Sequence, residues 1–139
     1  MIQNDLLTPT RRRSVPPIAL EHILRDVARR VPELHWATIS SPNGVIQATY
    51  DPFQKEQPDR ILAIASAVLS LGERAFHKLQ HGRLTHLTLA GDAGVLVVRP
   101  VGEEYILAIS IPPSVEVAAA VDALAQAARA LRPQFHSEA

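Results

Sequence analysis

The sequence predicts an α+β sandwich in which a five-stranded antiparallel sheet carries helices on both faces. The hydrophobic period changes between about 3.6 and 2 residues, giving the order helix, two strands, helix, three strands, helix. Two of the expected strands, VLVVRP at 95–100 and YILAISI at 105–111, are apolar on both sides. Such strands require cover on both faces of their sheet, and one helix on one face with two on the other would provide it.

Composition is ordinary for a soluble globular chain that forms one domain. The chain has 139 residues, of which 47% are hydrophobic and 20% charged. Fourteen basic and fourteen acidic residues cancel, so no global field directs the protein to nucleic acid or to a membrane surface. There is no cysteine, no signal-peptide pattern at the start and no apolar run of about 18 residues. These features predict a cytoplasmic protein without disulfides.

The expected domain covers residues 16–133. Residues 1–15 are polar and include the run Arg11–Arg13, so we interpret them as a flexible basic tail. This tail either contacts phosphates, acidic lipid or an acidic partner, or is solvated without a specific role. Residues 134–139 are expected to be a frayed C-terminus.

A first helix is expected to begin at Pro16 and Pro17, because proline suits the first helical turn, with Ser14 or Val15 at the cap. Pro32 marks its end, since the residue before a proline disfavours helical angles. The stripe that this helix buries consists of Leu20, Ile23, Leu24, Val27 and Val31.

Two strands at 35–40 and 45–50 follow as a hairpin. Asn43-Gly44 is expected to supply the positive φ angles of a tight turn. Apolar residues alternate with Gln47 and Thr49 in the second strand. One wet face of this kind is typical of a strand at the edge of a sheet.

The stretch Pro58–Leu79 predicts a helix with two usable faces, ended by Gly82. An apolar arc would pack on the sheet; it consists of Ile61, Ile64, Ala65, Val68, Leu69, Gly72, Phe76 and Leu79. The opposite side gathers the small residues Ala63, Ser66, Ala67 and Ser70. Small side chains let another backbone approach closely, although they are also ordinary fillers of a surface helix. We interpret this side as a contact face.

Three strands at 83–90, 95–100 and 105–111 precede a closing helix at about 115–131, which Pro133 limits. The two continuous apolar strands are expected to be central. The alternating strand LTHLTLA is expected at an edge, where an unpaired ladder is open to pairing. A second copy at this edge would also bring two middle helices together, so the sequence predicts a homodimer.

Three segments in this order resemble the Roadblock / dynein light-chain superfamily, in particular its free-standing bacterial members of the MglB kind. They are SSPNGVIQAT at 40–49, IASAVLSLGERAFHKLQHG at 64–82 and LTLAGDAGVLVVRPVGEEYILAIS at 87–110. The resemblance implies a profilin-like roadblock fold that dimerises through its middle helix and third strand. It also implies a platform for Ras-like small GTPases. Members of the MglB kind stimulate GTP hydrolysis without inserting an arginine.

The resemblance assigns two sets of residues. The implied dimer interface contains Ala63, Ala67, Ser70, Arg74, His86 and Thr88. The implied GTPase contact contains Asp59, Arg60, Ser66, Glu73 and His77. The resulting hypothesis is a homodimeric regulator or scaffold that binds a Ras-like small GTPase, and stimulation of GTP hydrolysis is left open. The alternatives are a non-catalytic assembly platform in a larger complex and a small-molecule-sensing sandwich domain.

The sequence gives no reason to expect an active site, a cofactor or a metal. His77 and His81 have the spacing of a zinc pair on a helix, but no cysteine or nearby carboxylate completes the site. Gly91–Gly94 lies between two strands and so reads as a turn; a phosphate-cradling loop needs a helix N-terminus behind it. Arginines that could act in trans on a phosphoryl transfer are Arg60, Arg74, Arg83 and Arg99, although the family analogy argues against needing one.

Overall fold

The computed structural model describes residues 15–53 and 58–136. Its helices are α2 (Pro17–Arg30), α3 (Pro58–Leu79) and α4 (Val117–His136). Its strands are β1 (Trp36–Ser40), β2 (Ile46–Tyr50), β3 (Leu87–Ala90), β4 (Val95–Val101) and β5 (Tyr105–Ile111). The expected basic tail, apart from Val15, lies outside the described residues, as do residues 54–57 of the loop before α3 and residues 137–139.

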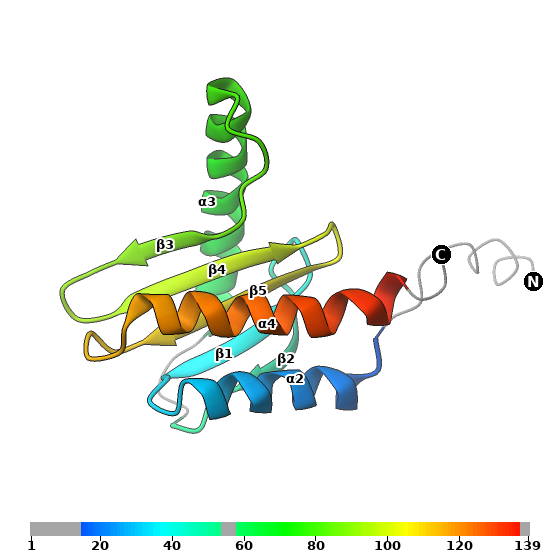
Figure 1. The fold of residues 1–139 in the computed structure, drawn as a ribbon, viewed down its shortest axis with the longest axis vertical. Coiled ribbons are helices and arrows are strands. Elements are labelled where there is room, and N and C mark those ends of the chain that lie inside the picture. Colours follow the sequence, from blue (N-terminus) through cyan, green and yellow to red (C-terminus); the bar gives the residue numbers. More distant parts are fainter. Residues whose placement is uncertain (1–14, 54–57, 137–139) are drawn as a thin grey trace, which may run out of the picture.

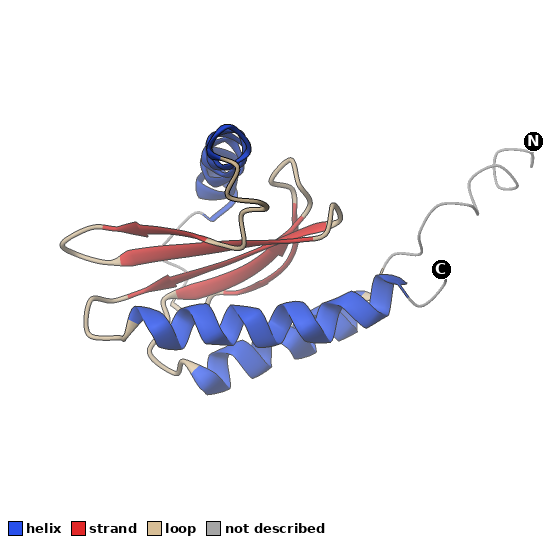
Figure 2. Cartoon of the chain, turned by 45° about the horizontal axis from the view of Figure 1, so that its top comes forward, coloured by secondary structure: helices blue, strands red, loops and turns tan. Residues whose placement is uncertain are grey.

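The strands form one antiparallel sheet in the order β2-β1-β5-β4-β3 (Figure 1). Helices α2 and α4 lie side by side on one face, and α3 crosses the other face (Figure 2). The predicted fold class, element order and division of the helices are therefore confirmed. The edges are also as predicted, because β2 and β3 are the outer strands and the continuous apolar strands β4 and β5 lie inside the sheet.

Helix α2 buries the stripe that its periodicity predicts, but its cap differs. The N-cap is Pro16, whose extended backbone (φ −60°, ψ 143°) places its carbonyl to accept the N–H groups of Ala19 and Leu20 at 3.0 and 3.2 Å. The expected cap at Ser14 or Val15 is therefore wrong. Val15 is instead buried, and its N–H donates to the Tyr105 hydroxyl at 3.3 Å.

Strand β3 is shorter than the predicted strand at 83–90. It begins at Leu87, which pairs with Val98 of β4. Continuing the register would place Thr85 opposite Pro100, which has no N–H to donate to a ladder. The four residues 83–86 therefore leave the sheet, and this edge of β4 is open beyond Val98.

Helix α4 does not end at Pro133, as the sequence predicts, but continues to His136. Proline disfavours helical angles in the residue before it without forbidding them. The preceding turns are fixed by packing, because Ala128 and Leu131 are fully buried against the sheet. This packing outweighs the local preference.

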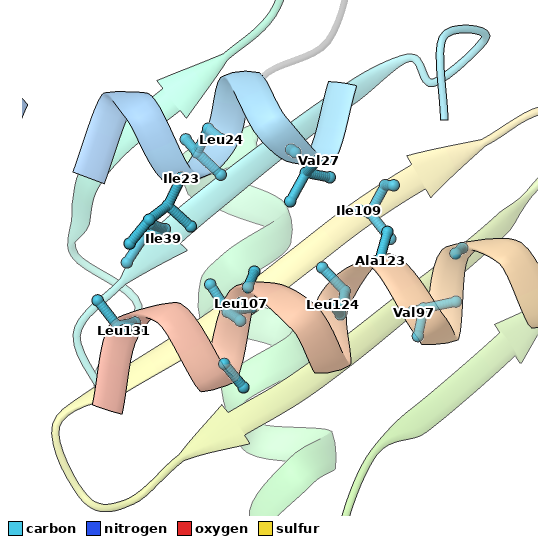
Figure 3. Packing of buried hydrophobic residues seen from close by; sticks show 14 of the residues in the cluster. Ile23, Leu24, Val27, Ile39, Val97, Leu107, Ile109, Ala123, Leu124 and Leu131 are labelled. Atoms are coloured by element: carbon cyan, nitrogen blue, oxygen red, sulfur yellow. The ribbon is translucent and has the colours of Figure 1, made fainter. Parts of the chain in front are cut away.

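The core is divided by the sheet into two clusters of unequal size. Twenty-one buried residues fill the space between the sheet and the helices α2 and α4. Figure 3 shows part of this cluster, including Leu24 of α2, Leu124 of α4 and Leu107 of β5. Only eight buried residues form the cluster on the α3 side, where Trp36 and Leu62 are the largest fully buried side chains.

The α3 side of β1 also contains buried polar atoms. Thr38 Oγ1, Ser40 Oγ and Trp36 Nε1 are inaccessible to solvent and have no hydrogen-bond partner. Ala37 and Ile39, which alternate with them, belong to the α2/α4 cluster. The face of β1 beneath α3 is thus less completely satisfied than the opposite face.

Candidate functional site

Helix α3 is attached to the sheet mainly through its N-terminal half. The Ser66 hydroxyl donates a hydrogen bond to the Pro42 carbonyl in the β1–β2 hairpin. Gly44 of the same hairpin has φ +87°, and a Cβ at this position would lie 3.1 Å from Ala63 Cα. Only Gly44 of the expected Asn43-Gly44 pair has positive φ. Glycine is required here both by the backbone angle and by the close approach of the helix.

The C-terminal half of α3 extends beyond the edge strand β3 (Figure 1). Its contacts with the rest of the protomer come from Gly72, beside Leu84 Cδ2, and from Phe76, whose ring meets His81 edge-on at 5.5 Å. The other side chains from Ser70 to Leu79 are exposed. Half of a long helix is therefore presented to solvent on nearly all sides.

The helix ends in a Schellman motif rather than at Gly82 as the sequence predicts. The N–H of Gln80 donates to the His77 carbonyl at 3.1 Å, and the N–H of His81 donates to the Phe76 carbonyl at 3.0 Å. Gln80 occupies the left-handed position with φ 57°, where glycine is usual. The motif could not be found by searching for glycine, because a glutamine fills its special position.

The outward face of α3 contains the four helix residues that the resemblance assigns to a dimer interface. Ala63, Ala67, Ser70 and Arg74 are all exposed and lie opposite the buried side of the helix. The face is more apolar than expected, since Ile64 is 63% and Leu71 60% exposed.

The predicted apolar arc was too broad for one sheet face to cover. Ile64 and Leu79 were expected in the core but are exposed, whereas Leu62 was omitted and is completely buried. The spacing of Ile64, Ala67 and Leu71 by three and four residues is a second apolar stripe, which sequence analysis could have separated from the first.

The residues expected to contact a GTPase do not form one continuous surface. Asp59, Arg60, Glu73 and His77 are exposed, but Glu73 lies 13 residues after Arg60, which is about 20 Å along a helix axis. Ser66 is not on an exposed rim; it is half-buried and bonded to the hairpin. The set therefore divides into a pair at each end of α3.

The free edge of β3 continues the exposed surface of α3. Thr88 and Leu89 are exposed. His86 was expected within this strand, but it precedes β3, is half-buried and has its Nδ1 3.1 Å from Thr85 Oγ1.

Three open hollows lie along the C-terminal half of α3, and Glu73 lines all of them. One, of about 260 Å³, lies between α3, the β1–β2 hairpin and the β4–β5 turn. Another, of about 490 Å³, lies on the exposed side of α3 beside Arg74 and His77. The third, of about 380 Å³, adjoins the open end of β4 and is lined by Arg83, Arg99 and Arg132.

Two kinds of feature are absent from the part of the chain that the structure describes. Its histidines and carboxylates form no group of three that could hold a metal ion. None of its helices combines the length and apolar character that crossing a membrane requires.

A sandwich fold with an exposed apolar stripe on a protruding helix, next to an unpaired strand edge, is typical of protein-interaction modules. The Roadblock/LC7 domain model matches residues 22–110, from within α2 to within β5. The chain belongs to this family.

Solved structures show the same fold at low sequence identity. A Roadblock/LC7 domain from Streptomyces avermitilis has a TM-score of 0.71 and 21% identity over 86% of this chain and 97% of that one. Myxococcus xanthus MglB has a TM-score of 0.80 and 10% identity over 90% of this chain and 93% of its own. A structure described as MglB with a tetrameric arrangement has a TM-score of 0.73 and 14% identity, covering 86% and 91% of the two chains. No curated protein matches the sequence.

Proposed function

We propose that the protein is a homodimeric regulator or scaffold that binds a Ras-like small GTPase. The observation that carries the proposal is the exposed apolar stripe of Ile64, Ala67 and Leu71 on a helix that extends beyond its own sheet. Such a stripe is unfavourable in water and is typical of a surface that is covered in the working assembly.

A second copy of the chain fits this surface. Residues spaced by three and four positions form the ridge that packs between helices, and Ala63, Ala67 and Ser70 allow a close approach of two backbones. The β3 edge next to the stripe is unpaired and can extend the sheet with an identical strand. The tetrameric arrangement of an MglB structure with the same fold supports self-association.

The dimer is tested by placing a charge in the centre of the stripe. Ala67→Glu is expected to convert the dimer to a monomer, because a carboxylate buried between two helices has no partner. Size-exclusion chromatography with light scattering measures the mass. Ala119→Glu, on the exposed side of α4, is the matched control and should remain dimeric. A dimer that persists in Ala67→Glu would show that another surface associates.

The proposed GTPase contact is the charged rim of the paired helices. Glu73 and His77 lie one turn apart near the protruding end, and Asp59 and Arg60 lie at the other end. In a dimer each rim is present twice, so a partner can contact ends of different helices. This assignment rests on the family resemblance and on the exposure of these side chains.

The proposal is tested with a Ras-like GTPase from the same genome. Single-turnover GTP hydrolysis is measured with and without this protein, and co-elution with this protein is scored for the GTP- and GDP-bound forms of the GTPase. Acceleration identifies an activator, and co-elution without acceleration identifies a scaffold. Glu73→Gln and His77→Ala should weaken binding several-fold at unchanged stability, whereas the matched exposed change Glu21→Gln on α2 should not. Absence of binding to every such GTPase of that genome would contradict the proposal.

A further inference from the structure

Three arginines from different parts of the chain line the hollow of about 380 Å³ at the open end of β4. Arg99 belongs to the α4 face of β4, because Val97 and Val101, two positions away on either side, are buried in the α2/α4 cluster. Arg132 comes from α4, and Arg83 from the segment that precedes β3.

The local fold explains why these arginines line the same hollow. Strand β3 starts only at Leu87, so the preceding residues leave the sheet edge where Pro100 offers no N–H. This departure creates the hollow and places Arg83 beside it. The hydroxyl-bearing Thr85 lines the same hollow.

The arginines have no acidic partner within the described part of the chain. The ion pairs found there join Asp26 to Arg29 and Arg30, on α2. Glu73 also lines the hollow, but its carboxylate forms no ion pair with any of the three arginines. The lining side chains therefore carry three positive charges against one negative charge.

Arg99 combines a buried donor with neighbouring positive charges. Its Nε is buried and has no hydrogen-bond acceptor. Burial, followed by the nearby positive charges of Arg132 and Arg129, lowers the pKa of the Arg99 guanidinium. A buried, unpaired donor and neighbouring like charges both destabilise the folded state. A destabilising cluster of this kind is typical of a functional site.

We propose that this hollow binds a small phosphate-bearing anion through Arg83, Arg99 and Arg132. The guanidinium fork matches the oxygens of a phosphate, which accepts paired hydrogen bonds from it. The volume falls in the range of small-molecule sites, about 300–1,000 Å³. Three cationic side chains around a single hollow suit a compact polyanion better than an extended acidic peptide, which would need a strip of cations. The site lies within one protomer and does not depend on the proposed dimer or GTPase.

Calorimetric titration of the full-length chain with inorganic pyrophosphate tests the site, with NMR shifts of the arginine Nε–H groups as a second readout. We expect saturable binding, with selective shifts at Arg83, Arg99 and Arg132. Arg99→Gln and Arg132→Gln should each weaken binding about tenfold or more, because each removes a charge-assisted contact. Arg99→Lys should weaken it by a smaller factor, because the charge remains without the fork. Arg25→Gln, on the exposed side of α2, is the matched control and should bind normally.

Thermal unfolding separates a lost site from a lost fold. Both glutamine variants should unfold at or above the temperature of the unchanged protein, and pyrophosphate should raise the unfolding temperature only when the site is intact. Equal effects of sodium chloride at the same ionic strength would overturn the proposal. So would binding that disappears when Arg11–Arg13 are replaced by glutamine but survives Arg99→Gln. Lack of pyrophosphate binding, with Arg99→Gln weakening a protein complex instead, would assign the hollow to a macromolecular contact and also overturn it.

Discussion

The two faces of the sheet are built in different ways. The face under α2 and α4 is covered by two helices that pack on each other and on the strands, with 21 buried residues. The face under α3 is covered by one helix that crosses it and leaves it, with eight buried residues and three buried polar atoms without partners. The helices α2 and α4 bury the apolar residues of their face within the protomer, whereas α3 leaves apolar side chains exposed to solvent.

This difference supports the proposal that protein partners bind on the α3 face. A helix that only closed a core would keep its apolar residues inward and charged residues outward. Helix α3 has apolar side chains on both sides, with Leu62 buried and Ile64 exposed. We therefore expect the α2/α4 face to determine global stability and the α3 face to respond to partners. Substitutions on each face can test that division.

Truncation of a buried leucine compares the two faces directly. Leu124→Ala, on the two-helix face, should lower the free energy of unfolding by about 3 kcal/mol, because it leaves a cavity in a close-packed core. Leu62→Ala removes an equally buried side chain, but α3 can shift into part of the space. We expect a smaller loss and faster hydrogen exchange confined to α3. Chemical denaturation and amide exchange measure both effects; equal losses with uniform exchange would contradict the division.

The attachment of α3 to the hairpin is tested at Gly44. Gly44→Ala should lower the free energy of unfolding by about 2 kcal/mol, since the new methyl group meets the α3 backbone and the positive φ is unfavourable. Gly82→Ala is the matched control because Gly82 also has positive φ, at +86°, but a Cβ there meets nothing within 4 Å. It should cost only about 1 kcal/mol. Equal losses of unfolding free energy in the two variants would show that the close contact between the hairpin and α3 does not restrict residue 44.

The unsatisfied polar layer beneath α3 is tested by an apolar replacement. Thr38→Val keeps the shape of the side chain and removes a buried hydroxyl that has no partner, so it should raise the free energy of unfolding by about 1 kcal/mol. Thr49→Val, at the exposed position directly opposite on β2, should leave stability nearly unchanged. A loss of stability in Thr38→Val would mean that water or a ligand satisfies the hydroxyl.

The ion pairs of Asp26 on the surface of α2 are expected to make the smallest contribution to stability. Hydrogen bonds from Arg30 and then Arg29 lower the pKa of Asp26. Because the folded pKa is below the unfolded value, the stabilisation is present above the unfolded pKa and is lost as the pH falls through the folded pKa. The Asp26 side chain is half exposed, so the contribution should be only a few tenths of a kcal/mol. Unfolding at acidic and neutral pH, compared with Asp26→Asn, would show it; an unchanged pH dependence in the variant would refute it.

Most of the fold could be predicted because its signals are periodic and local. The stripe of α2, the alternation in β2 and the two-sided apolar strands β4 and β5 each report which faces are buried. The edge position of β3 follows from the same patterns.

The failures involve competition between local preference and packing. Proline at 133 was expected to end α4, but buried neighbours keep the turn helical. Gln80 takes a position usually given to glycine, because two backbone hydrogen bonds close the end of α3. Ser66 was expected on an exposed rim, but its hydroxyl donates a hydrogen bond to the Pro42 carbonyl in the hairpin. The sheet under α4 and the Pro42 carbonyl beside Ser66 are distant in sequence, so no local window could reveal them. The hydrogen bonds at the end of α3 are local, but their left-handed residue is not the glycine that usually marks such a motif.

The family, the element order and a middle helix with small residues opposite its apolar arc can be inferred from the sequence alone, since these depend on side-chain periods and motif order. The apolar residues of that helix that are left exposed, and the arginines that line one hollow, are evident only in the folded chain. Arg83, Arg99 and Arg132 are separated along the chain and lie in the segment before β3, in β4 and in α4. Their positions around the hollow depend on where β3 starts and where α4 crosses the sheet. Long-range geometry of this kind leaves no pattern in the local sequence.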